Sequence, residues 1–404
     1  MAIRVGILTS GGDCPGLNAT LRGVAKALYH RMGDKVEIVG IMNGYDGLIN
    51  GNFREMSPDE FSGILTVGGT ILGTKRTPFK KMRVVEEDKV DKVAAMKKNY
   101  RAAKLDCLLC LGGNGTHKTA NLLRTEGLNI VTLPKTIDND LPVTDHTPGY
   151  GSAARYVAST VREICLDASV YQQPAVTIIE LMGRHAGWVT AASALARKFK
   201  GDNPLLIYMP EVAFDMEQFF SEAEAALKKN PTLVICVSEG IKDASGKLIC
   251  EYGSEAKLDN FGHKMLTGCG KLLENQLKNR FGIKVRSVEL NVSQRCSSIM
   301  ASETDINEAA ALGSFAVEKA LSGSTSQMAA LRRKPSPSYE TEYFLTPVET
   351  VCNKEKTFPL EWITRNGTDI STEFTDYALP LIQGTPNRPM ENGLPLYLYR
   401  KSER

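Results

Sequence analysis

The chain has 404 residues, which is long enough for two or three globular domains. Its composition, 42% hydrophobic and 24% charged, excludes a wholly disordered protein. Its 49 basic and 46 acidic residues leave a net charge of +3, which argues against nucleic-acid or membrane-surface binding through bulk charge. No apolar run approaches the ~20 residues of a membrane span, and residues 1–8 lack a signal-peptide layout. We therefore expect a cytoplasmic protein.

Apolar runs alternate with polar, glycine-rich turns along the chain. Runs that predict strands cover 4–9, 36–41, 105–111, 129–133, 175–181 and 232–238. Helical patterns follow the first and third of these runs, over 18–32 and 117–126. Repeated strand, turn and helix is typical of parallel sheets covered by helices on both faces. The sequence predicts two such α/β units, one up to about Tyr150 and one after it.

Nine cysteines, an odd number, are scattered over the chain. Cys107 and Cys110 form a CxxC, a spacing found in metal and redox sites. They lie inside the apolar run 107–111, however, where cysteine behaves as a small buried hydrophobe. We interpret both as core residues of a protein in a reducing compartment.

Two glycine-rich turns join a predicted strand to a predicted helix. In Thr9–Gly16 the glycines allow positive φ and close backbone approach, so successive N–H groups can converge on a phosphate. The turn is neither a Walker loop nor a GxGxxG fingerprint. Gly112–Thr116 is a second turn of this kind. Each alone is also explained as an ordinary tight turn, but two at parallel strand ends predict a polyphosphate ligand.

A dense polar run, Lys135-Thr136-Ile137-Asp138-Asn139-Asp140, follows the strand that ends before Pro134. Asp and Asn form turns, so a plain loop is one interpretation. The other is chemical, because the run offers a base, a second carboxylate for orientation or Mg²⁺, a hydroxyl and a cation. Phosphoryl transfer requires these parts, since it depends on positioning and charge neutralisation.

Five motifs together resemble the phosphofructokinase family. They are 10–19 (SGGDCPGLNA), 68–76 (GGTILGTKR), 112–116 (GGNGT), 134–140 (PKTIDND) and 182–184 (MGR). They occur in the family's order and at closely similar spacing, over roughly three quarters of the chain. The resemblance implies a 6-phosphofructokinase of glycolysis, which phosphorylates the 1-hydroxyl of fructose 6-phosphate to give fructose 1,6-bisphosphate.

The resemblance also implies an architecture and an assembly. Its fold would be two parallel-sheet, three-layer α/β domains with the active site in the cleft between them, plus a C-terminal extension. Residues 1–150, with a segment near 296–335 returning to them, would bind the donor phosphates and carry the catalytic aspartates. Residues 151–295 would bind fructose 6-phosphate, and 336–404 would pack on the core or on a neighbouring subunit. A homodimer or homotetramer is implied.

Residue roles follow from the same resemblance. Asp138 would be the general base for the 1-hydroxyl, and it is ionised at neutral pH because free Asp titrates near ~3.9. Catalysis would also involve Lys135, Thr136, Asp140 and Arg184. The donor phosphates would be bound by Gly12, Arg76, Gly113, Asn114, Gly115 and Thr116, and Mg²⁺ by Asn114 and Asp140. The sugar phosphate would contact Thr136, Asp138, Met182, Gly183, Arg184, Glu239, Arg286 and Arg295.

Three features depart from the family's common pattern. Asn114 stands where an acidic residue near Mg²⁺ is usual, and Val292 where many members have His or Tyr. The arginine that many members lend to a neighbouring subunit's substrate is missing from 172–175. A catalytically weak, sugar-phosphate-binding regulatory relative therefore stays an alternative.

The phosphoryl donor depends on two positions. Pyrophosphate-dependent members typically carry Asp at the position of Gly115 and Lys at that of Lys135. Gly115 leaves room for the α-phosphate of ATP, whereas Lys135 points toward pyrophosphate, although some ATP-dependent relatives combine the two as here. Thr119 stands where ATP users often have glycine. We expect ATP, with a reversible pyrophosphate-dependent enzyme as the alternative.

Overall fold

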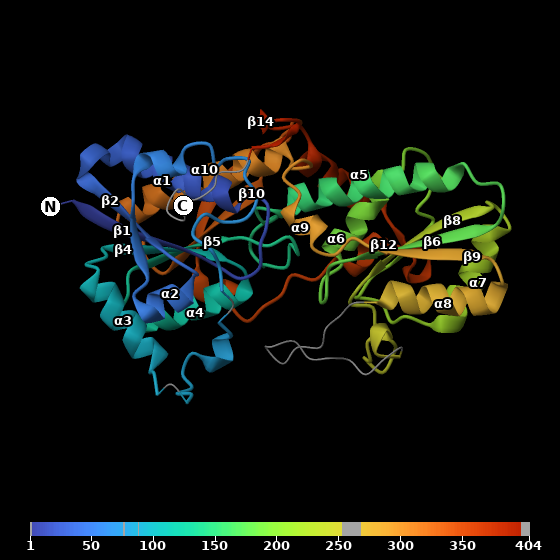
Figure 1. Ribbon diagram of the computed structural model, residues 1–404, viewed down its shortest axis with the longest axis horizontal. Coiled ribbons are helices and arrows are strands. Elements are labelled where there is room, and N and C mark those ends of the chain that lie inside the picture. The colour runs from blue at the N-terminus through green and yellow to red at the C-terminus, as the bar shows by residue number, and fades with distance from the viewer. Residues whose placement is uncertain (1, 76, 88, 253–267, 397–404) are drawn as a thin grey trace.

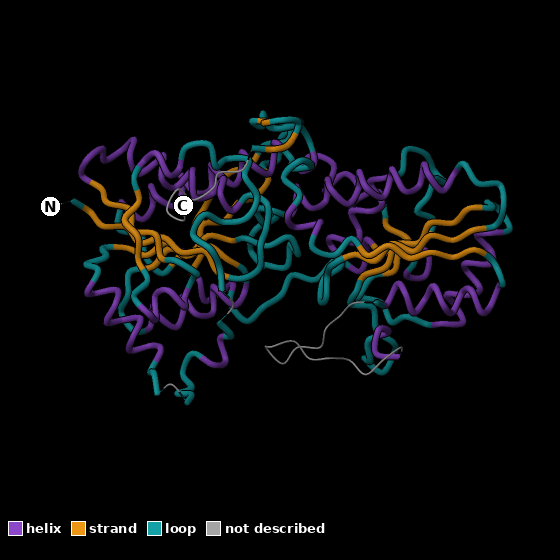
Figure 2. Tube along the Cα trace, in the orientation of Figure 1, coloured by secondary structure: helices purple, strands orange, loops and turns teal. Residues whose placement is uncertain are grey.

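The computed structural model describes residues 2–75, 77–87, 89–252 and 268–396. These residues form two lobes, each built around a β-sheet (Figure 1). In both lobes the strands make a central layer with helices on either side (Figure 2). The predicted class, two three-layer α/β domains with parallel sheets, is confirmed.

The larger sheet contains seven strands among the described residues, in the order β11-β10-β5-β4-β1-β2-β3. The central five are parallel, and the two edge strands pair antiparallel with their neighbours. In chain order the strands are β1 (Ile3–Ser10), β2 (Val36–Ile41), β3 (Phe53–Met56), β4 (Cys107–Gly112), β5 (Ile130–Pro134), β10 (Gln327–Arg333) and β11 (Thr341–Pro347). One face is covered by α1 (Leu17–Met32) and α10 (Glu303–Leu321), the other by α2 (Tyr45–Asn50), α3 (Lys92–Ala102) and α4 (Asn114–Thr125) (Figure 1).

The smaller sheet has the order β7-β8-β6-β9, and its pairs are all parallel. Its strands are β6 (Ala175–Leu181), β7 (Leu206–Tyr208), β8 (Thr232–Ser238) and β9 (Lys284–Glu289). Helix α5 (Tyr150–Ser169) lies along one face, while α7 (Met216–Leu227) and α8 (Cys269–Phe281) cover the other (Figure 1). Short helices α6 (Trp188–Ala191) and α9 (Ser293–Cys296) follow β6 and β9.

The predicted strands agree with the structure because burial on both faces demands continuous apolar runs. The predicted ranges 36–41, 175–181 and 232–238 coincide with β2, β6 and β8. The predicted helix start at His117 is wrong, because α4 begins at Asn114. The polar residues before His117 resemble a turn, but they form the first turn of the helix.

The CxxC cysteines are core residues, as predicted. Cys107 and Cys110 are free thiols buried in β4. Burial raises the pKa of each to about 12, so both thiols stay protonated at neutral pH.

The C-terminal extension packs on the core of its own chain. After β11 come α11 (Val348–Val351), the short strands β12 (Ile363–Thr364) and β13 (Asp369–Ile370), α12 (Thr372–Ala378), and the strands β14 (Met390–Glu391) and β15 (Leu394–Pro395). The amide of Ile207 in β7 donates to the carbonyl of Thr368, 2.9 Å away. Trp188 packs against Phe358, with ring centroids 5.0 Å apart, and against Tyr377 at 5.4 Å. Because β11 pairs with β10 in the larger sheet, the extension packs on both lobes.

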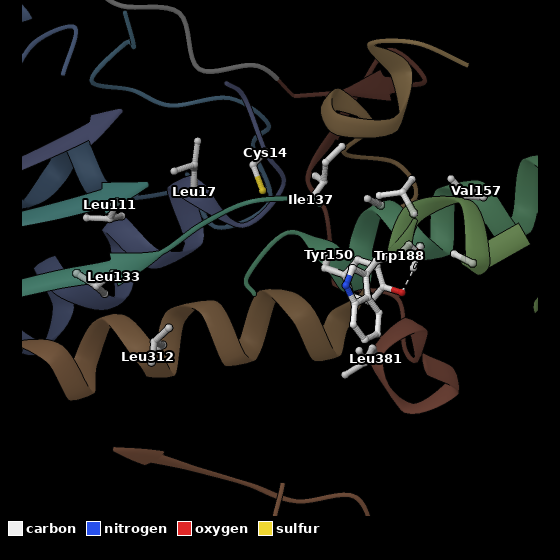
Figure 3. Close-up of a cluster of buried hydrophobic side chains, with 14 of the residues drawn as sticks. Cys14, Leu17, Leu111, Leu133, Ile137, Tyr150, Val157, Trp188, Leu312 and Leu381 are labelled. Carbon is white, nitrogen blue, oxygen red and sulfur yellow. Dashed lines mark hydrogen bonds between the residues drawn. The ribbon is translucent and has the colours of Figure 1, made fainter. Parts of the chain in front are cut away.

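One hydrophobic core runs through both lobes (Figure 3). Leu111 and Leu133 contribute from the larger sheet, and Ile137 continues the core beneath the polar run. Tyr150, at the start of α5, is fully buried and donates its hydroxyl hydrogen to the carbonyl of Trp188 at 3.1 Å. Buried apolar side chains of both lobes therefore belong to one cluster. None of the described helices is both long and apolar enough to cross a membrane.

Candidate active site

Strand register brings the polar turns to one edge of the larger sheet. Ser10 at the end of β1 pairs with Gly112 at the end of β4, and Gly112 pairs with Pro134 at the end of β5. The three strands therefore end at the same level, and the turns that follow them lie side by side. In the smaller sheet Leu181 pairs with Ser238, so the turns after β6 and β8 are level in the same way. Parallel α/β sheets bind ligands at this edge.

A pocket of about 390 Å³ opens where these turns meet. Residues of both lobes line it, as does an aromatic and apolar wall that includes Tyr45 and Phe79. Eleven residues of the predicted site are among its lining: Gly12, Gly113, Asn114, Gly115, Thr116, Lys135, Thr136, Asp138, Asp140, Met182 and Arg295. The structure thus gathers most of the predicted residues in one cavity.

The glycine turns present backbone N–H groups at the starts of two helices. Gly11 and Gly16 have φ of 97° and 87°, which only glycine adopts without strain, and Gly16 caps α1. Helix α4 begins at Asn114, directly after Gly113. Helix N-termini carry partial positive charge and unpaired N–H groups, which suit an anionic phosphate. Both turns line the pocket.

The polar run after β5 is held by both glycine turns and by a hydrogen bond within the run. The amide of Lys135 donates to the carbonyl of Gly112 at 3.0 Å, and its ammonium donates to the carbonyl of Gly12. The hydroxyl of Thr136 accepts from the amide of Asp138 at 3.1 Å. Asn139, between the two aspartates, has a left-handed φ of 53°. This conformation lets both Asp138 and Asp140 line the pocket.

Carboxylates lie in and beside the cavity, and their electrostatics favour a cation. Burial, followed by the charge of Asp138, raises the pKa of Asp140 to about 7. Burial likewise raises the pKa of Glu239 to about 7, against the hydrogen bond that its Oε1 accepts from the amide of Gly183 at 3.3 Å. Positive charge entering the pocket would stabilise the ionised forms.

The residues present fit Mg²⁺. The side-chain oxygen of Asn114 is buried, and no donor contacts it, while Asp138 and Asp140 supply carboxylates in the same pocket. Within the described residues no three acidic, His or Cys side chains form a complete metal cage. Mg²⁺ commonly binds through one or two carboxylates together with substrate phosphates, so such a cage is unnecessary.

Hydrogen bonds to three residues hold the turn after β6, one of them the Glu239 contact given above. Gly183 has a φ of 132°, and its carbonyl accepts from the hydroxyl of Ser238 at 2.6 Å. The amide of Met182 donates to the side-chain oxygen of Gln294 at 3.2 Å. Arg184 and Glu239 lie in the turns after β6 and β8, beside the pocket lining rather than within it. Sequence reasoning did not identify Gln294, although it directly precedes Arg295.

Among the described residues, Gly183, Arg184, Glu239 and Arg286 of the predicted site do not line the pocket. Arg286 lies in β9, 3.6 Å from the carboxylate of Asp167 at the end of α5, with its guanidinium 5.6 Å from the ring centre of Tyr171. It does not line the pocket. Arg76 lies outside the described residues. Val292, the departure from the family pattern, is 51% exposed.

Sequence reasoning missed the residues that the C-terminal extension brings to the site. The side chain of Asn114 donates to the carbonyl of Lys354 at 3.2 Å, and the amide of Lys356 donates to the carbonyl of Asp140 at 2.7 Å. Burial lowers the pKa of Lys356 to about 8. No motif marks these residues, which come more than 200 positions after the turns that they contact. Tyr45 and Phe79 were also missed, although Phe79 follows the motif 68–76 closely.

Comparison with known proteins identifies the family of this chain. A family model described as phosphofructokinase matches residues 4–320. The chain belongs to the phosphofructokinase family. An ATP-dependent 6-phosphofructokinase of Spirochaeta thermophila is 38% identical over 88% of this chain and 92% of its own length. A pyrophosphate–fructose 6-phosphate 1-phosphotransferase of Xanthomonas campestris pv. campestris is 34% identical over 97% and 95%.

A solved phosphofructokinase has the same overall fold. The pyrophosphate-dependent phosphofructokinase from Marinobacter aquaeolei superposes with a TM-score of 0.85 at 28% identity, covering 100% of this chain and 98% of that one. The chain is therefore a phosphotransferase of the phosphofructokinase family, and its relative in Xanthomonas campestris pv. campestris is named for transfer to fructose 6-phosphate.

Proposed function

We propose that this chain is a 6-phosphofructokinase that uses ATP as its favoured donor and Asp138 as its general base. The observation that carries the proposal is the pocket itself. Two glycine turns and the run after β5 meet there, and the second lobe contributes Met182 and Arg295. Donor phosphates would lie on the glycine turns, and the sugar phosphate would lie toward Met182 and Arg295.

The reaction is an in-line transfer of the terminal phosphoryl group. Asp138 accepts the proton of the 1-hydroxyl while that oxygen bonds to the phosphorus, and the bond from phosphorus to the leaving phosphate oxygen breaks. Lys135 and Arg184 supply positive charge where negative charge develops. Asn114 and Asp140 would hold Mg²⁺, which would neutralise charge on the donor phosphates.

Two features of the pocket favour ATP. A side chain at position 115 would have open space around it, because an ideal Cβ there meets no atom within 4 Å. Gly115 therefore leaves room beside the phosphates for the rest of a nucleotide. The rings of Tyr45 and Phe79 also line the pocket, and such rings suit a purine base.

A specific observation favours pyrophosphate as the second candidate. The ammonium of Lys135 is bound to the carbonyl of Gly12 inside the pocket, where it can neutralise a compact inorganic donor. Several of the most similar relatives are named as pyrophosphate-dependent.

Purified protein assayed on fructose 6-phosphate with each donor, with and without Mg²⁺, tests the proposal. We expect the higher kcat/KM with ATP, a dependence on Mg²⁺, and a loss of ~10³-fold or more in kcat for Asp138→Ala.

Gly115→Asp should lower kcat/KM for ATP by at least ~100-fold through repulsion of the α-phosphate. The neutral control Gly115→Asn has nearly the same size and should lose far less. Equal losses in the two variants would contradict the electrostatic argument, and higher activity with pyrophosphate would overturn the donor assignment.

A further inference from the structure

A short segment of the C-terminal extension, residues 353–358, spans the active site. We call it the strap, and it connects α11 to the aromatic cluster around Trp188. Beyond the Asn114 and Asp140 contacts described above, the carbonyl of Lys356 accepts from the indole nitrogen of Trp188 at 3.1 Å. The amide of Phe358 donates to the carboxylate of Glu211 at 3.0 Å. Within five residues, the strap thus contacts the donor turn, the catalytic run and the second lobe.

The side chain of Lys356 points into the loop that carries the aspartates. Its ammonium donates to the side-chain oxygen of Asn139 at 3.1 Å and to the carbonyls of Thr144 at 3.2 Å and Asp145 at 2.7 Å. An ammonium has three hydrogens, so these contacts use its full donor capacity. The indole of Trp188 lies 5.1 Å from the ammonium and adds a cation–π contact.

The loop between β5 and α5 needs such a donor because it lacks regular secondary structure. Asn139 and Val143 have positive φ of 53° and 74°, and for a β-branched valine this conformation is costly. Carbonyl groups that turn inward in such a loop require hydrogen-bond donors, because unpaired buried carbonyls are unfavourable. Lys356 provides donors to two of them from outside the loop.

Asn139 transmits this support to both aspartates. Its side-chain oxygen accepts from Lys356 and from the amide of Thr147 at 3.2 Å, and its side-chain nitrogen donates to the hydroxyl of Tyr377 at 2.9 Å. The residue is fully buried, with Asp138 before it and Asp140 after it. A shift of Asn139 would therefore move both carboxylates.

We propose that Lys356 is a positioning residue for phosphoryl transfer, holding the loop 139–145 so that Asp138 and Asp140 face the bound substrates. The inference rests on the proposed function, because it assigns Lys356 a part in that reaction. Misplacement of a reacting group by about 1 Å costs on the order of 100-fold in rate. Loss of Lys356 should therefore lower kcat much more than it changes substrate binding.

Lys356→Met tests the proposal, because methionine keeps much of the length of the side chain and removes the ammonium. With the donor that the wild type uses, we expect kcat to fall ~100-fold, while KM for each substrate stays within about 2-fold. The matched control is Lys334→Met, at a lysine that directly follows β10. Its side chain is 44% exposed, pairs with Glu340 and does not line the pocket, so kcat should stay within about 2-fold of wild type.

Three further measurements make the outcome decisive. Thermal unfolding of Lys356→Met separates loss of folding from loss of positioning. Lys356→Arg keeps a cation with several donors and should recover at least ~10-fold of the lost kcat. Propylamine added to Lys356→Ala should also raise kcat, whereas the same concentration of sodium chloride should not.

Each alternative outcome overturns the inference. The first is an unchanged kcat in Lys356→Met, and the second is a rise in its KM alone. The third is an equal loss of thermal stability in Lys356→Met and Lys356→Arg, together with no increase in the kcat of Lys356→Ala on addition of propylamine. Failure of the proposed function itself has a different signature, because the wild type would then be inactive with both donors.

Discussion

His117 lies in α4, one residue after the Gly112–Thr116 turn, and its side chain is completely buried. Burial is the main cause that lowers its pKa to about 4, and the nearby charge of Lys135 acts in the same direction. In the unfolded chain the pKa of His117 is ~6.5, well above its pKa in the folded chain. The folded state is therefore favoured while His117 is neutral, and this advantage is lost as the pH falls from about 6.5 to about 4.

His117→Asn should remove that pH dependence. Between pH 7 and pH 4 we expect the wild type to lose roughly 3 kcal/mol more free energy of unfolding than the variant. Urea unfolding at stepped pH values measures the difference between the two curves. His30→Asn, at an exposed position of α1, is the control and should follow the wild type. Parallel curves for wild type and His117→Asn would contradict the assigned cause.

At the scale of elements, α1 and α10 pack closely although they lie nearly 300 residues apart in the chain. A Cβ on Gly23 would come within 2.0 Å of the carbonyl oxygen of Ala310, and one on Gly313 within 2.5 Å of the carbonyl oxygen of Thr20. The hydroxyl of Ser314 donates to the carbonyl of Gly23 at 3.1 Å. Both clashes would involve backbone atoms, which cannot move without separating the helices.

Gly23→Ala therefore sets packing against helix propensity. Alanine stabilises a helix by ~1 kcal/mol relative to glycine. Overpacking against backbone typically costs about 1–3 kcal/mol. Because the added Cβ would lie 2.0 Å from a carbonyl oxygen, we expect a cost near the upper end of that range. We expect a net loss of about 1–2 kcal/mol, measured as a lower urea midpoint. Lys26→Ala, exposed on the same helix, should change stability by less than about 0.5 kcal/mol. A stability gain in Gly23→Ala would show that the helices separate without cost.

At the scale of the whole molecule, the position of Arg286 bears on assembly. The family resemblance assigns this residue to the 6-phosphate, yet within one chain it lies outside the pocket and beside Asp167. Close to Asp167 in the chain, Leu166 in α5 and Val170 directly after α5 are 64% and 72% exposed. Exposed apolar side chains of this size suit an interface. The family resemblance implies a homo-oligomer, in which we expect Arg286 to serve the sugar phosphate of a neighbouring copy.

Subunit complementation tests this arrangement. Arg286→Ala and Asp138→Ala should each be nearly inactive alone. Co-expressed as a dimer with reciprocal sites, they should recover about a quarter of wild-type activity, because half of the dimers carry one intact site of two. Activity no higher than the mean of the separate variants would contradict a shared site, as would a monomeric mass in solution.

Much of the fold was predictable from local pattern. Strands β2, β6 and β8 coincide with the predicted ranges because buried parallel strands are continuous apolar runs. The start of α4 was not predictable in this way, because Asn114-Gly115-Thr116 has the composition of a turn. The two glycine turns and the run Lys135–Asp140 were identified because phosphate binding and phosphoryl transfer need particular residue types close together in sequence.

By itself, the sequence determined the α/β class, the family and the residues after β1, β4, β5 and β6, because each depends on residues within a few positions of one another. Tertiary structure alone decided which distant residues complete the site. Lys356 and Asn139 are 217 residues apart, and only the path of the strap brings them together. It also decided that Arg286 lies outside the pocket of its own chain. Contacts of this kind follow from how the lobes and the extension pack, and packing leaves no periodic signal in sequence.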